Sequence, residues 1–427
     1  MATMPNQRWI LAAAAAGLIA RLAFGLLYWT GKPMTHDERE YLALAQSLQQ
    51  GQGLHYPPGH QSGTAAQFGR APGYPAFLAL LAAPADADAA PTRVKVAQSF
   101  LGALVVWMIG VIAMRAAGVR AGEIAAWIAA FYPALVWTPA YVFSESLFMP
   151  IAFATVMVLH AARVRADEER TARGGSALTV AAGLIAGAGI LVRPAMLLFL
   201  PLVALWFVRR KRWTLALAFC VSAAAVVTPW TLRNAKAYGR FVLVASEGGV
   251  TFWTGNHPLA IGEGDLAANP ALKQAEVTFR QAHPRLTAEE LEPLYYQDAL
   301  TNIRSNFGWW LRLLGRKTFY TFVPIGPSYA LHSTRYRVGS VLPYALLAPL
   351  ALIGFSRLVR RGGAATPLLL LAIAVVLTGL IFFPQERFRI PVIDPAVIVC
   401  ASVVLAEGVR SQGARRPFVA EAGRSRA

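Results

Sequence analysis

The sequence predicts an all-α protein that crosses a membrane many times. Of its 427 residues, 56% are hydrophobic and 15% are charged, which is too apolar for a soluble globular protein of this length. Apolar runs of membrane length recur along the chain, and most of the 40 basic residues lie in short loops between them. Basic short loops mark the cytoplasmic side of a membrane protein. The formal charge of +18 therefore reports topology, and we expect no nucleic-acid partner.

Seven apolar runs predict an N-terminal transmembrane module over residues 1–230. The first run, 9–29, can cross a hydrocarbon core of about 30 Å. We expect it to be retained, because no signal-peptide cleavage site follows it. Arg21 interrupts this run, so its guanidinium either snorkels to the membrane surface or faces a polar interior. The other six runs span residues 94–114, 122–138, 142–162, 177–192, 196–208 and 215–230.

Residues 231–338 are the longest polar region and predict a large loop outside the membrane. Thr287 and Glu290 have the spacing of a capping box, but Pro293 argues against a long helix from that start. The stretch 295–320 mixes tryptophans with basic residues, which is typical of a helix at the membrane interface. A C-terminal module, 339–409, and a basic tail that we expect to be disordered complete the chain, with apolar runs at 341–358, 368–383 and 392–406 and the tail at 410–427.

Both cysteines lie in apolar runs, so the sequence predicts no disulfide framework. Counting crossings from a cytoplasmic N terminus places every short basic loop on the cytoplasmic side. The same count places residues 30–92, 231–338 and 385–391 together on the outer side of the cell's inner (cytoplasmic) membrane. We therefore expect the functional site at this outer rim.

The first external loop opens with an acidic sequence, Thr-His-Asp-Glu-Arg-Glu-Tyr at 35–41, which leads into a short amphipathic helix. The side chains of Asp37 and Glu38 diverge by about 100° if this segment is helical, so we expect them to have separate roles. His36 and Tyr41 flank the pair and could join the same site. The alternative is that the acids only cap the start of the helix, where negative charge is favoured.

Cations from other loops could meet these acids at the outer rim. Arg70 precedes a proline-rich turn that contains Tyr74, and it could bind a phosphate or hold the loop at anionic headgroups. Glu145 opens the fourth run in an apolar context, where an unpaired carboxylate costs a few kcal/mol. It therefore needs a partner, which could be Arg21, Arg193 or a substrate.

A second basic motif, Glu-Arg-Phe-Arg-Ile-Pro, follows the ninth apolar run. Arg387 and Arg389 are two residues apart, so in an extended segment both could face one way and clamp a phosphate or diphosphate. Positive charge in a short external loop opposes the usual charge bias, and phosphate binding would explain it.

Other chemistries find little support in the sequence. The segment 248–257 could offer Trp253 to a sugar, although an ordinary packed tryptophan is the stronger interpretation. The chain has no P-loop, no G-x-S-x-G sequence and no H-E-x-x-H sequence, and its seven histidines are scattered. We predict no protein metal site, although a divalent cation could still join Asp37.

Taken in order, six short motifs resemble the family-39 glycosyltransferases of the integral-membrane GT-C class, which includes protein O-mannosyltransferases and lipid A aminoarabinose transferases. The resemblance runs over residues 9–407 and implies a GT-C-like bundle, for which the apolar runs of this chain predict about 10–11 transmembrane helices. The motifs are the D-E pair after the first run, R-x-P-G-Y-P in the same loop, S-E-x-L-F opening the fourth run, L-x-R-P after the fifth, P-W-T-x-R-N after the seventh and E-R-F-R-I-P.

The resemblance implies transfer of a sugar from a polyprenyl-phosphate donor to a lipid, glycan or protein acceptor outside the cytoplasmic membrane. Asp37 matches the family's loop carboxylate, the general base of an inverting attack, with Glu38 orienting the base or contacting the acceptor. Arg70, with Arg387 or Arg389, would neutralise the lipid phosphate as it leaves, and this needs no metal in principle. The family usually has more spans than the ten counted here, so a further span could lie at 309–323.

Three other functions stay open at this point. A transporter or flippase of lipid-linked sugars should carry ionisable residues near the bilayer midplane and often repeated halves, whereas these charges gather at one rim and no repeat is evident. A non-catalytic subunit of an envelope complex would use the long loop for docking. A membrane glycan polymerase or ligase would share most of this layout.

Overall fold

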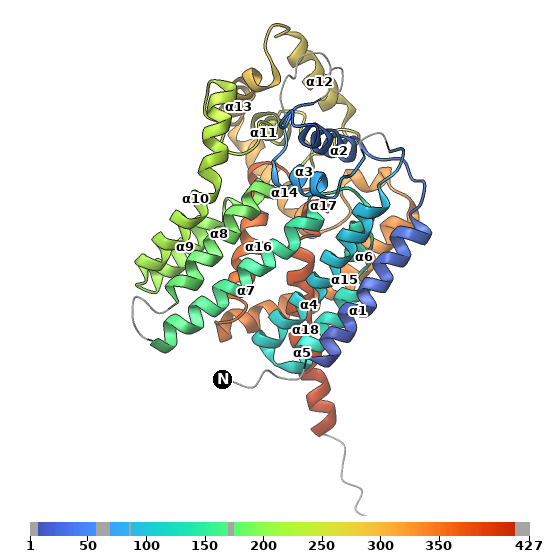
Figure 1. Ribbon diagram of the computed structural model, residues 1–427, viewed down its shortest axis with the longest axis vertical. Coiled ribbons are helices and arrows are strands. Elements are labelled where there is room, and N and C mark those ends of the chain that lie inside the picture. Colours follow the sequence, from blue (N-terminus) through green and yellow to red (C-terminus); the bar gives the residue numbers. More distant parts are fainter. Residues whose placement is uncertain (1–6, 57–68, 85–86, 170–174, 415–427) are drawn as a thin grey trace, which may run out of the picture.

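The computed structural model describes residues 7–56, 69–84, 87–169 and 175–414, and its regular elements within these ranges are helices. Figure 1 shows an elongated molecule with α5 and α18 toward one end of its long axis and α11, α12 and α13 toward the other. One large apolar core of buried residues joins the long helices. The predicted tail at 410–427 lies mostly outside the described residues.

Each of the ten predicted apolar runs forms helix. Among the described residues, five helices are long and apolar enough to cross a membrane, or six with one bent pair. The long ones are α1 with η1 (Arg8–Tyr28), α4 (Thr92–Ala117), α7 (Glu145–Glu169), α10 (Trp213–Tyr238) and α15 (Thr334–Arg361). The remainder are α5 (Val119–Phe131), α6 (Pro133–Trp137), α8 (Ser176–Val192), α9 (Phe199–Arg209), α16 (Thr366–Ile381) and α18 (Ile393–Ala414). The chain is thus an all-α, multi-pass membrane protein, as predicted.

The third predicted run, 122–138, is not one straight helix. It breaks between α5 and α6 with a bend of 60°, because Tyr132 precedes Pro133 and adopts an extended conformation. Pro133 has no N–H to offer the carbonyl of Ala129 four residues earlier. The guanidinium of Arg21 compensates: it donates to the oxygens of Ala129 at 3.3 Å and Ala130 at 3.2 Å. Arg21 is 1% exposed, so it serves the broken helix and does not snorkel.

The end of the molecule that carries α11 to α13 is built from shorter helices that the polar loops supply. The first loop forms α2 and α3, and the long loop forms four helices, two of them in place of the single interfacial helix predicted over 295–320. They are α2 (His36–Gln49), α3 (Gly73–Leu80), α11 (Gly248–Asn256), α12 (Pro270–Gln281), α13 (Ala288–Ser305) and α14 (Phe307–Phe322). The expected capping box of Thr287 and Glu290 is present at the start of α13.

Pro293 does not end that helix, contrary to expectation. The capping box fixes its first turn, and Leu291, Tyr295 and Ala299 bury one face in a small outer core around Trp253 of α11. This burial outweighs the one backbone hydrogen bond that a proline removes. The face of α13 that does not pack into this small core lines the cavity described below.

The opposite end of the molecule carries the basic loops. Asp167 accepts ion pairs from Arg163 at 3.5 Å, Arg210 at 3.7 Å and Arg212 at 3.5 Å. Glu407 near the end of α18 pairs in the same way with Arg361 at 2.5 Å. Arginines thus gather at this end, in the loops for which the positive-inside pattern predicted a cytoplasmic location.

Candidate active site

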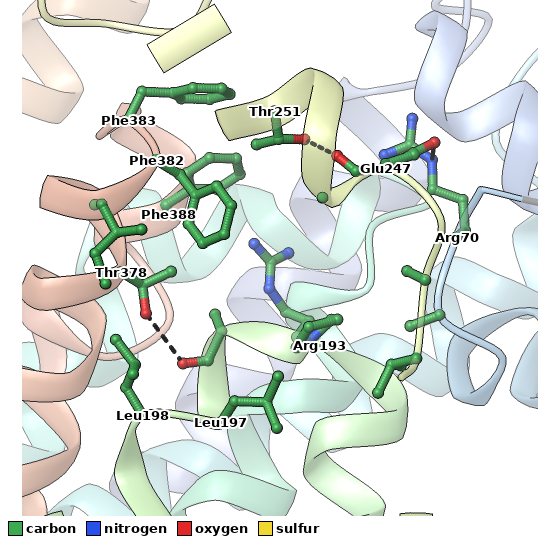
Figure 2. A pocket seen from close by; sticks show the side chains of 18 of the residues that line it. Arg70, Arg193, Leu197, Leu198, Glu247, Thr251, Thr378, Phe382, Phe383 and Phe388 are labelled. Carbon is green, nitrogen blue, oxygen red and sulfur yellow. Dashed lines mark hydrogen bonds and ion pairs between the residues drawn. The ribbon is translucent and has the colours of Figure 1, made fainter. Parts of the chain in front are cut away.

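A cavity of about 1260 Å³ lies where the outer helices meet the ends of the spans. Its polar wall is formed by residues of α2, by the start of α7, by the segment that follows α8 and by the segment that follows α16. Its apolar wall includes Leu197, Leu198, Phe382 and Phe383 (Figure 2). The cavity thus joins a charged pocket to an apolar surface, which suits a molecule with a charged head and a hydrocarbon chain.

The local start of α2 decides how the acidic pair is oriented. Thr35 and Glu38 form a capping box, and the Oε1 atom of Glu38 also accepts from the N–H of Val142 at 2.9 Å. Glu38 is 2% exposed and lies outside the cavity wall. Its carboxylate therefore caps α2 and also joins this helix to the segment before α7. The capping alternative is thus the correct one for Glu38. The neighbouring Asp37 points into the cavity instead.

Two guanidiniums hold Asp37 from opposite ends of the sequence. Its Oδ1 atom lies 2.6 Å from Nη2 of Arg70, and its Oδ2 atom lies 2.5 Å from Nη1 of Arg387. Burial alone would raise the pKa of Asp37, but the charges of Arg387 and Arg70 outweigh it and hold this pKa well below its usual range. Asp37 is therefore ionised throughout the physiological range.

Arg70 is shared among several acidic groups. Besides Asp37, its guanidinium contacts Glu40 at 2.5 Å and Glu247 at 3.5 Å, and it lies 5.4 Å from the ring centre of Tyr41. Burial disfavours its charge, but these carboxylates raise the pKa of Arg70 well above its ordinary value. Arg70 is therefore a fixed cation at the centre of the polar wall.

Glu145 has the partner that its position demands. It pairs with Arg193 at 2.7 Å, and Arg193 also donates to the hydroxyl of Ser144 at 3.0 Å. Arg193 and Arg387 both lie over the ring of Phe388, at 5.3 and 5.2 Å from its centre. The ring brings these two cations to one side of the cavity, and Figure 2 shows Arg193 beside Phe388.

The predicted clamp of Arg387 with Arg389 does not form. The segment is a helical turn, α17 (Glu386–Arg389), and not an extended strand, so side chains two residues apart point roughly 200° apart. Arg389 is 3% exposed, pairs with Asp394 at 2.7 Å and lies 4.0 Å over the ring of Tyr344. The second cation beside Arg387 at the ring of Phe388 is therefore Arg193, and not Arg389 as predicted.

Arg389 still lines the cavity, whereas His36 and Tyr74, like Glu38, lie outside its wall. His36 is exposed on α2 and lies 3.2 Å from Glu40. Tyr74 is fully buried, donates its hydroxyl to Oε1 of Gln98 at 2.7 Å and packs edge-on against Tyr41. Tyr41 does line the cavity, with its hydroxyl donating to Ser144 at 3.3 Å.

We expect Tyr74→Phe to lower the free energy of unfolding by about 1–3 kcal/mol, because it leaves a buried acceptor on Gln98 without its donor. The rate of any reaction in the cavity should stay within about twofold of wild type. Thermal unfolding in detergent and the transfer assay described below measure the two effects. A large loss of transfer without a loss of stability would instead place Tyr74 at the substrate.

Sequence reasoning missed two acidic residues of the site. Glu40 lies one helical turn after Asp37, so the spacing within α2 could have revealed it. Glu247 lies in a polar segment far along the chain, and no pattern in the sequence connects it with Arg70. Trp253 is 1% exposed and donates to Asp298 at 2.6 Å, so the packed interpretation describes it. Within the described ranges, no three His, Cys, Asp or Glu side chains gather as metal ligands.

No family model matches the chain, and no curated protein matches it either. Several solved structures, in contrast, match the chain. An oligosaccharyltransferase of Archaeoglobus fulgidus, in complex with Zn and sulfate, superimposes with a TM-score of 0.56 at 16% identity, over 95% of this chain and 50% of that one. The AglB oligosaccharyltransferase of the same organism, with an inhibitory peptide and a dolichol-phosphate, gives a TM-score of 0.53 at 16% identity, over 98% and 53%.

The ArnT protein of Cupriavidus metallidurans matches more loosely, with a TM-score of 0.42 at 14% identity, over 94% of this chain and 77% of that one. This chain spans about half the length of the oligosaccharyltransferases, and at such identities the likeness concerns the fold. The chain therefore has the GT-C membrane fold that the order of its motifs predicted.

Proposed function

We propose that this chain is a glycosyltransferase that moves a sugar from a polyprenyl-phosphate donor to a hydroxyl group of a lipid, glycan or protein acceptor. The observation that carries the proposal is the ion-paired Asp37, held between Arg70 and Arg387 on the wall of a cavity that also has an apolar side. The fold adds support, because an archaeal neighbour was solved with a dolichol-phosphate and a peptide.

The donor phosphate is proposed to bind at Arg387 and Arg193. Both guanidiniums line the cavity beside Phe388 and can present planar pairs of N–H donors to phosphate oxygens. The hydrocarbon chain of the donor would lie along the apolar wall at Leu197, Leu198 and Phe382. As the sugar departs, the phosphate gains negative charge, which fixed cations stabilise without having to reorganise.

Asp37 is proposed as the general base. In the free site its two guanidinium partners make it a weak base, since they lower its pKa. A donor phosphate competes for Arg387 and so removes one of these partners, which raises the basicity of Asp37 when the donor is bound. Asp37 can then take the proton of the acceptor hydroxyl while its oxygen attacks the anomeric carbon with inversion.

The proposed location is the outer face of the cytoplasmic membrane. Residues of α2 and α11 line the cavity, and Figure 1 shows these helices toward one end of the molecule. The arginine-rich loops around Asp167 and Glu407 lie at the other ends of the spans. Arginine-rich short loops favour the cytoplasmic side. A polyprenyl-linked sugar on the outer leaflet would reach the cavity from the membrane.

The test is transfer of labelled sugar in proteoliposomes that contain the full chain. A panel of mannosyl, glucosyl and arabinosyl polyprenyl phosphates is offered with lipid, glycan and peptide acceptors, and consumption of donor is followed. We expect one donor to be consumed with release of polyprenyl phosphate. If the protein moves labelled donor across the bilayer without consuming it, the transporter alternative holds and the proposal is wrong. Growth of a sugar chain would identify a polymerase.

A further inference from the structure

The carboxylate of Glu247 has no task in the reaction proposed above. Glu247 lies on the segment between α10 and α11, lines the same cavity as Asp37 and approaches Nε of Arg70 to 3.5 Å. Figure 2 shows the two side chains next to each other at one wall. Arg70 therefore meets acidic groups from two distant parts of the chain, α2 and this segment.

The backbone holds Glu247 at this place. The N–H of Ser246 donates to the carbonyl of Gly69 at 3.1 Å, directly beside Arg70. The indole of Trp230 donates to the carbonyl of Val244 at 2.9 Å. A Cβ atom on Gly69 would lie 2.4 Å from Oε1 of Glu247. The absence of a side chain at residue 69 therefore lets the carboxylate come close to Arg70.

The charges of the polar wall explain what this contact can do. Arg70 pairs with Asp37, Glu40 and Glu247. A guanidinium that pairs with one carboxylate alone lowers the pKa of that group strongly, whereas a guanidinium shared with further carboxylates lowers it less. When Asp37 accepts a proton, Arg70 keeps two negative partners and is not left as an isolated buried cation.

We propose that Glu247 is a positioning residue that sets the basicity of Asp37 by sharing the guanidinium of Arg70 with it. The inference rests on the proposed function, in which Asp37 is the base. In the step concerned, the acceptor oxygen forms its bond to the anomeric carbon as its proton moves to Asp37. The bond from that carbon to the phosphate oxygen breaks, and its electron pair leaves on the polyprenyl phosphate. Glu247 exchanges no atom in this step.

The first test is Glu247→Gln, assayed in proteoliposomes with the donor that the panel identifies. Without the charge of Glu247, Arg70 is shared between Asp37 and Glu40 alone, so it interacts more strongly with Asp37 and weakens it as a base. We expect kcat to fall about tenfold, with the donor KM within about twofold of wild type. The wild-type kcat should fall at the pH where Glu247 becomes protonated, and the variant should lack this fall, so that its acid limb lies at lower pH.

Burial raises the pKa of Glu247, Arg70 opposes this, and Glu40 and Asp37 raise the pKa further. Glu247 therefore ionises at a higher pH than an ordinary glutamate, and its influence on Asp37 is present only above that pH. The acid limb of the wild-type enzyme should accordingly lie above that of Glu247→Gln. A role confined to folding would change the unfolding temperature and leave this limb where it is.

A second variant keeps the charge and changes only its position. Gly69→Ala places a methyl group against the carboxylate of Glu247, whose flexible side chain must move away from Arg70. We expect a smaller fall in kcat and a shift of the acid limb in the same direction. Glu290→Gln is the matched control, because Glu290 is a capping residue of α13 outside the cavity and glutamine also serves in a capping box.

Three outcomes would overturn the inference. An active Glu247→Gln variant with the wild-type pH profile shows that Glu247 does not tune Asp37. A loss of more than about a thousandfold, with no acid limb left, would make Glu247 itself the base. A wild-type chain that transfers no sugar overturns the proposed function and, with it, this inference. The first result leaves the proposed function standing, and the second leaves sugar transfer standing but replaces Asp37 as its base.

Discussion

Asp37→Asn is expected to lower kcat for sugar transfer by about 100-fold to 10,000-fold, the range usual for removal of a general base. The amide cannot accept the proton of the acceptor hydroxyl. It also gives Arg70 and Arg387 a neutral partner where they had a carboxylate. The measurement is single-turnover transfer in proteoliposomes with saturating donor and acceptor, so that a change in affinity does not enter.

Asp88→Asn is the control for this substitution. Asp88 is exposed in the same external loop and lies outside the cavity wall. Its replacement should leave kcat within about twofold of wild type. Transfer by Asp37→Asn at more than about one tenth of the wild-type rate would exclude Asp37 as the base. The test requires that the variant keeps the wild-type unfolding temperature.

Arg387→Ala is expected to lower kcat/KM for the donor by about 100-fold to 1,000-fold, which is typical for loss of one group that stabilises developing charge. Both kcat and KM should change, because Arg387 is proposed to hold the phosphate in the bound donor and also as the phosphate leaves. Binding of a polyprenyl phosphate and transfer of its sugar measure the two parts separately. Arg335→Ala, an exposed arginine at the start of α15, should change neither.

The same substitution has a signature in the pH profile. Arg387 lowers the pKa of Asp37 in the free protein, so its removal raises that pKa and protonates Asp37 at a higher pH. The acid limb of kcat/KM, which reports the free enzyme, should therefore move to higher pH in Arg387→Ala. A lower donor affinity with an unmoved limb would mean that the ion pair with Asp37 has no bearing on catalysis. Arg387→Lys should keep part of the activity, since it retains charge without the planar pair of donors.

The helical class and the positions of the apolar helices follow from the sequence, because a span must satisfy its backbone internally and present about 20 apolar residues to lipid. Of the ten predicted spans, five or six are long and apolar enough to cross a membrane within the described residues. The clustering of Asp37, Arg70 and Arg387 at one rim followed from loop order and charge bias. Local patterns were less informative where a tertiary contact competed with them. Pro133 interrupts a run for which hydropathy predicted one continuous helix. Burial against α11 allows α13 to continue through Pro293.

What the sequence determined by itself is the class of protein, the face that carries its polar loops and the residue types that could act there. The tertiary structure alone decided which of them meet. It joined Glu38 to the backbone of Val142, buried Arg389 on Asp394 and brought Glu247 to Arg70. The reason is physical: periodicity and charge bias act over a few neighbouring residues, whereas an ion pair between distant segments depends on how whole helices pack. The assignment of partners within a charged cluster is therefore a property of the fold.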